Sequence, residues 1–204
     1  MAEIGGPISG TADPTEILAA EETGWTGLHS LIDQLTPDQA ARPGYYVEGW
    51  SAKDLLAQVG VWLAEAGMML ERITVGTYRD EDVDVDAVNR LSLDAMRDLP
   101  FSTVKAQASA ARTRMRRAVL GLNSPSPEAT WWMAKAGPEH YEEHLPRLRD
   151  SRSCARGNSS TPVPSPRGCA AARAGPTGLS RVPLPPSIGS RRRATRHRPR
   201  PRGS

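Results

Sequence analysis

Cysteine is scarce in this chain, and both copies stand near its end. Cys154 and Cys169 are the only cysteines among 204 residues, so the first 150 residues contain none. That part of the chain therefore has no disulfide to stabilise it and no thiol nucleophile. It also lacks any apolar run near the roughly 20 residues that span a bilayer. The opening MAEIGGPISG does not have the basic-then-apolar order of a signal peptide, so a cytoplasmic location is expected.

Acidic residues and lysine are both missing after Asp150. The last 54 residues hold 12 arginines, nine prolines and nine serines, whereas the preceding 150 hold 14 basic and 23 acidic residues. The last 54 residues, with this composition, bury too little apolar area to offset their ordering entropy, so we expect them to be disordered. The chain therefore divides into a flexible N-terminus (1–12), an acidic domain (13–150) and a disordered basic tail (151–204).

The basic tail has two interpretations. Its arginines could contact nucleic acid or acidic surfaces by charge alone. Alternatively, a change of reading frame in a GC-rich gene would produce the same abrupt loss of acids and lysine, because the remaining residues are mostly those of GC-rich codons. The abruptness favours a frameshift product, so nucleic acid is an unlikely partner.

Apolar residues recur at helical spacing through the acidic domain, and no useful stretch alternates as a strand would. Asp13-Pro14 is typical of a helix start, and Ser51 with Asp54 predicts a capping box before the strongest helix. Ser102 is the expected cap of a later helix. The predicted helices cover 14–35, 51–75, 86–97, 102–122 and 138–150. The fold class is therefore all-α, a helix bundle.

This periodicity gives two predictions about which helix faces are buried and which are exposed. Trp62 falls on the apolar face of the helix over 51–75 and is predicted to be a core residue. The helix over 102–122 carries a basic face, which we interpret as a solvent-exposed surface. That face consists of Arg112, Arg114, Arg116 and Arg117.

Two histidines stand four residues apart near the end of the acidic domain. At this spacing His140 and His144 leave the same face of a helix. Two imidazoles on one face form half of a metal site, which a ligand from a facing helix would complete. The alternative is a pair of partly exposed histidines on a charged helix.

Three segments, in order, resemble the DinB-like four-helix-bundle family. Residues 49–58 (GWSAKDLLAQ) are similar to its G-W-S-x-x-D-x-L-A-H stretch. Asp86–Asn89 followed by Asp98-Leu99-Pro100 fits its middle segment, and Trp131 followed by 140–145 (HYEEHL) is similar to its closing helix. The family includes the amino-terminal domain of mycothiol-dependent maleylpyruvate isomerases. The resemblance covers roughly residues 14–150.

The resemblance implies a divalent metal, zinc or nickel, held by a histidine of the second helix and two ligands four apart on the last. The last two fall on His140 and His144, but the first falls on Gln58. An amide oxygen is a weaker ligand than imidazole for these metals. Glu65, two turns further along the same helix, is an alternative ligand that would require a shifted site.

The function implied is that of a metal-binding bundle, a thiol-dependent isomerase or transferase-like enzyme acting on a small molecule. A low-molecular-weight thiol such as mycothiol would be its cofactor. The alternative is a non-catalytic small-molecule binding or sequestering protein with a degraded metal site, which Gln58 favours. No membrane partner is expected, and a homodimer remains open. The sequence identifies neither a substrate nor a catalytic residue.

Overall fold

Helices account for the regular structure of the chain, as the sequence predicts. The computed structural model describes residues 13–44, 49–80, 83–124 and 126–157, and these ranges contain seven helices and no strand. The helices are α1 (Pro14–Ile32), α2 (Pro37–Ala40), α3 (Ala52–Thr74), α4 (Val85–Met96), α5 (Phe101–Leu120), α6 (Pro127–Ala136) and α7 (Pro138–Gly157). The all-α fold class is confirmed.

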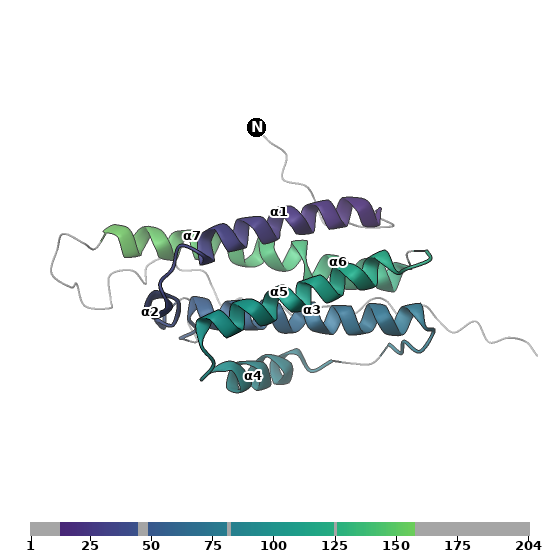
Figure 1. Cartoon of the computed structure of the whole chain (residues 1–204), viewed down its shortest axis with the longest axis horizontal. Coiled ribbons are helices and arrows are strands. Elements are labelled where there is room, and N and C mark those ends of the chain that lie inside the picture. The colour runs from purple at the N-terminus through teal and green to yellow at the C-terminus, as the bar shows by residue number, and fades with distance from the viewer. Residues whose placement is uncertain (1–12, 45–48, 81–82, 125, 158–204) are drawn as a thin grey trace, which may run out of the picture.

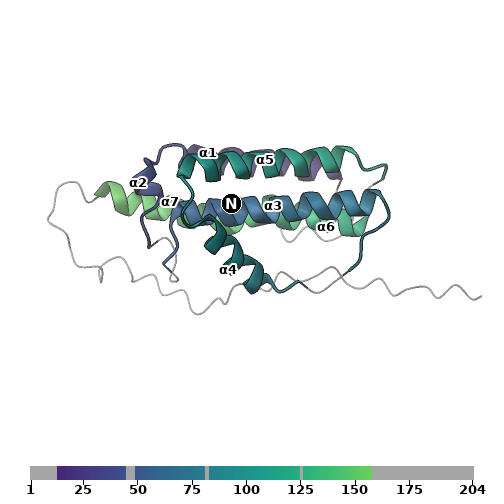
Figure 2. The ribbon, with the colours of Figure 1, turned by 60° about the horizontal axis from the view of Figure 1, so that its bottom comes forward.

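Four long helices form the body of the bundle (Figure 1). α3 packs along α5, and α1 packs along α7. α6 contacts both α3 and α7 and so joins the two pairs. α4 crosses the side of α3 at an angle (Figure 2). In this arrangement α7 and α3 lie on opposite sides of a shared interior.

Helix α3 is the centre of the core. Its buried residues lie on several faces, because α4, α5 and α6 all pack against it. Gly60 permits a close approach to α5, since a Cβ at this position would lie 3.1 Å from the Cα of Ala108. The large side chains that are fully buried include Leu55, Leu56, Leu63 and Leu70 of α3, Leu28 and Ile32 of α1, Met115 of α5 and Tyr141 of α7.

Local capping explains where the helices begin and end. The predicted capping box at the start of α3 is present: the backbone N–H of Ser51 donates to Asp54 Oδ2 at 2.8 Å. Ser102 was expected to cap α5 but lies inside it, because that helix begins at Phe101 after Pro100 and has no side-chain cap. α1 ends at Ile32, three residues before the predicted end.

Two short helices occupy segments that the sequence analysis left as connections. In α2, Thr36 and Gln39 form a reciprocal capping box. In α6, the backbone N–H of Ala129 donates to the Ser126 hydroxyl at 3.2 Å. The helix α6 has only ten residues, and it buries Trp132 and Met133 against the core.

The last helix runs past the boundary drawn at residue 150. α7 extends to Gly157, seven residues into the segment assigned to the tail. The predicted flexible N-terminus (1–12) and the rest of the predicted tail (158–204) lie outside the described residues. Over the ranges that the structure covers, no helix is long and apolar enough to cross a membrane.

Candidate metal centre

The three predicted ligands meet in the interior between α3 and α7. Gln58 lies on α3, and His140 and His144 lie one turn apart on α7. Their exposed fractions are 6%, 9% and 4%, so all three side chains are buried. The alternative of two partly exposed histidines is therefore wrong. A bundle interior holds buried polar groups only where they have partners, which makes the contacts of this cluster informative.

Gln58 and His140 contact each other directly across the bundle. The Nε2 atom of His140 lies 3.3 Å from Oε1 of Gln58. The rings of His140 and His144 are tilted by 54°, with their centroids 4.7 Å apart. Position 58 thus faces His140, the first histidine of the pair.

Two residues that the sequence analysis did not assign to the site extend this cluster. Asn89 of α4 is buried, and its Oδ1 accepts hydrogen bonds from Trp62 Nε1 at 2.9 Å and from Gln58 Nε2 at 3.4 Å. Trp62 is a core residue, as predicted, but its indole N–H also serves this polar contact. The signal available in the sequence was an asparagine between apolar residues of the predicted helix over 86–97.

Burial keeps both histidines neutral. It lowers the pKa of His140 from 6.5 to about 4, an effect that a hydrogen bond with the backbone of Ala136 partly offsets. Burial lowers the pKa of His144 to about 2, and the positive charge of Arg147 acts in the same direction. A neutral imidazole keeps a lone pair, which metal ligation requires.

One distance in the cluster matches the spacing of two ligand atoms on a divalent metal. Two ligand atoms of a tetrahedral zinc ion lie about 3.3 Å apart when each bond is about 2.0–2.1 Å long. The distance from His140 Nε2 to Gln58 Oε1 is 3.3 Å. The donor set of two imidazoles and one amide oxygen suits a borderline cation such as zinc, although the amide is the weakest of the three donors.

Glu65 does not complete the cluster. Over the described part of the chain, no three His, Cys, Asp or Glu side chains lie close enough together to hold a metal ion. Glu65 is half-buried on α3, and burial raises the pKa of its carboxyl group. Gln58 is thus the residue that faces the histidine pair from α3.

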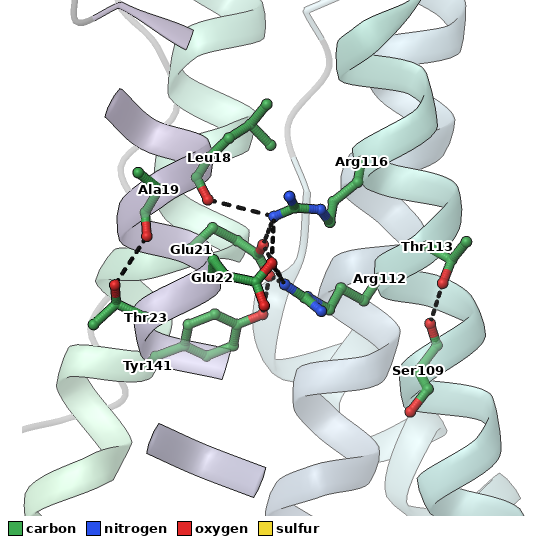
Figure 3. A network of polar contacts seen from close by, with 10 residues as sticks. All are labelled: Leu18, Ala19, Glu21, Glu22, Thr23, Ser109, Arg112, Thr113, Arg116 and Tyr141. Atoms are coloured by element: carbon green, nitrogen blue, oxygen red, sulfur yellow. Dashed lines mark hydrogen bonds and ion pairs between the residues drawn. The ribbon is translucent and has the colours of Figure 1, made fainter. Parts of the chain in front are cut away.

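A second buried polar cluster lies between α1, α5 and α7, and it corrects the interpretation of the basic face (Figure 3). Arg112 binds the carboxylate of Glu21 through two hydrogen bonds, of 2.7 and 3.0 Å. Arg116 contacts the same carboxylate and also the Leu18 carbonyl. The side chain of Glu21 is only 1% exposed. Two of the four arginines therefore form internal ion pairs instead of a solvated surface.

Tyr141 connects this second cluster to the candidate metal centre. Its hydroxyl donates to Glu21 Oε1 at 3.1 Å, while the preceding residue, His140, faces Gln58. Burial and the neighbouring Glu21 raise the pKa of Tyr141, so the phenol stays protonated and acts as the donor. Adjacent residues of α7 thus contact α1 on one side and α3 on the other.

Comparisons with known proteins identify a similar fold. An uncharacterised protein from Escherichia coli UTI89 has a crystal structure that superposes with a TM-score of 0.62. The match covers 74% of this chain and 98% of that one, at 12% sequence identity. No protein-family model matches the sequence, and no curated protein matches it significantly. At this identity the likeness shows the fold alone.

Proposed function

We propose that this chain is a divalent-metal-binding bundle of the DinB-like type, in which His140, His144 and Gln58 hold zinc or nickel. The observation that carries the proposal is the pair of buried, neutral imidazoles facing an amide oxygen across the bundle at 3.3 Å. Burial of polar groups in a helix bundle is costly, and a metal centre is a common reason for it.

The expected chemistry is thiol-dependent isomerisation or group transfer on a small molecule. A divalent cation at this position would lower the pKa of a low-molecular-weight thiol such as mycothiol placed beside it. His140 and His144 would hold the cation from one helix, and Gln58 would add an oxygen ligand from another. The buried setting would keep competing water away from the thiol.

The second candidate is a non-catalytic small-molecule binding protein that has lost the metal. The amide at position 58 favours it, because it is a weaker ligand for zinc or nickel than the imidazole that the DinB-like family has there. In this account the polar cluster would contact a small ligand directly. Metal affinity separates the two candidates.

Calorimetric titration with zinc tests the proposal. Cys154, Cys169 and His197 could also bind zinc, so the full-length chain should carry C154S, C169S and H197Q in every sample. We expect one weak zinc site in this background, lost when His144→Gln is added. If the background and the His144→Gln protein take up zinc equally, the metal-binding proposal is wrong and the second candidate stands.

The same titration repeated over pH should show affinity that persists below pH 6. Protons compete with zinc for imidazole, and an exposed histidine pair would lose affinity near its ordinary pKa of 6.5. Because burial lowers the pKa of His140 to about 4, competition should begin only as the pH approaches that value. Circular dichroism at each pH should verify that the bundle remains folded. A marked loss of affinity already at pH 6 would contradict this assignment.

A further inference from the structure

The polar cluster forms a chain of hydrogen bonds whose direction is determined at one end. An indole N–H can only donate. The atom of Asn89 that lies 2.9 Å from Trp62 Nε1 must therefore be its oxygen. The same oxygen faces the Gln58 amide, so the Gln58 atom nearest to it at 3.4 Å must be the nitrogen. Trp62 and Asn89 together thus turn the oxygen of Gln58 toward His140.

The position of Asn89 is itself supported. The ammonium group of Lys53, in the first turn of α3, donates to the backbone carbonyls of Arg97 at 2.6 Å and Leu99 at 3.2 Å. These carbonyls follow the last turn of α4, where a cation is favourable. The contact holds the end of α4 against the start of α3 and keeps Asn89 against Gln58.

This direction also determines what His140 Nε2 meets. The Gln58 atom that lies 3.3 Å from it is the amide oxygen, which can only accept a hydrogen bond. A neutral imidazole carries a single N–H, so in the apo protein Nε2 meets this oxygen favourably only as the N–H donor. A divalent cation bound between the two atoms would take the place of that proton.

We infer that Asn89 and Trp62 are positioning residues, which aim the oxygen of Gln58 at His140 Nε2 so that a divalent cation, rather than a proton, joins the two atoms. The inference rests on the proposed function. It assigns to Asn89 and Trp62 a role through Gln58, without direct contact with the metal. Residues that orient metal ligands in this way typically contribute about 10- to 100-fold in metal affinity.

A double-mutant cycle on zinc affinity tests this role, in the full-length chain carrying C154S, C169S and H197Q. Asn89→Leu should weaken zinc binding by about tenfold or more, because the Gln58 amide is then free to turn. Asn89→Asp keeps an oxygen for both donors and should retain the affinity. In a Gln58→Ala background, Asn89→Leu should have little further effect, since no amide remains to be oriented.

The outcomes separate this inference from the proposed function. Equal losses from Asn89→Leu in both backgrounds, or no loss in either, would overturn the positioning role while leaving the metal site in place. If neither this protein nor its Gln58→His variant binds zinc, both ideas are wrong. A metal-independent check is the His140 tautomer in the apo protein by ¹⁵N NMR. It should shift from Nε2–H toward Nδ1–H in Asn89→Leu, and an unchanged tautomer would contradict the positioning role.

Discussion

Glu21→Gln should destabilise the bundle by about 3–5 kcal/mol, the usual effect of removing one partner from a buried ion pair. The substitution keeps the size of the side chain, so the loss would come from charge and not from a cavity. The Arg112 side chain is only 15% exposed and would lose its principal anionic partner inside the protein. Chemical denaturation monitored by circular dichroism would measure the change in the free energy of unfolding.

The contacts of Glu21 explain why so large an effect is expected. Burial alone would lower the pKa of Arg112, but its hydrogen bonds with Glu21 and Glu22 outweigh this and raise it. Arg112 also lies over the Trp25 ring at 5.0 Å, which adds a cation–π contact. Because Tyr141 donates to the same carboxylate, helices α1, α5 and α7 all depend on this one anionic group.

An exposed ion pair between α3 and α5 provides a matched control. Glu71 of α3 binds Arg114 of α5 through two hydrogen bonds, of 2.8 and 2.6 Å, but both side chains are about half exposed. Because exposed ion pairs contribute little, Glu71→Gln should lower the stability far less than Glu21→Gln does. Similar losses for Glu21→Gln and Glu71→Gln would show that burial of Glu21 does not have the energetic role assigned to it.

The long helices could be predicted because their signals are local. The capping box of Ser51 and Asp54 and the apolar face that follows it specify α3 within about 25 residues of sequence. Similarly, the helix predicted over 102–122 is present as α5, and its apolar residues Val104, Ala108, Met115 and Val119 are buried. The helix α6 was missed because ten residues are too few for a clear period, and its stability comes from packing Trp132 and Met133 against other helices.

The candidate site could be predicted only in part, for a related reason. The spacing of His140 and His144 is a local property of one helix, and the resemblance supplied position 58. By contrast, Asn89 is 31 residues from its partner Gln58, and Arg112 is 91 residues from Glu21. Such pairs depend on how the helices cross. A local pattern of arginines therefore suggested a solvated face, whereas the fold turns two of them inward.

Gln58→His should raise the affinity for zinc by about 100-fold or more, because an imidazole replaces the weakest donor of the set. The side chain at position 58 already faces His140 at 3.3 Å, so the new ligand would enter an aligned position. Asn89 Oδ1, which now accepts from Gln58, could accept the second N–H of the new imidazole and orient it. Zinc calorimetry in the background without tail ligands would measure the gain.

Two controls make this result specific. Gln107→His adds a histidine on the exposed side of α5 and should leave zinc affinity unchanged. Adding His144→Gln to the Gln58→His protein should reverse most of the gain, because the remaining ligands no longer close the chelate. If Gln58→His binds zinc no better than Gln107→His, residue 58 does not act as a ligand position.

The most direct test of the metal centre is anomalous diffraction at the zinc absorption edge, from crystals of the unaltered chain grown with zinc. The account predicts an anomalous peak between α3 and α7, about 2.0–2.2 Å from a ring nitrogen of His140 and from Oε1 of Gln58, with His144 as a further ligand. Zinc bound only elsewhere on the molecule, with His140 Nε2 still hydrogen-bonded to Gln58, would contradict it.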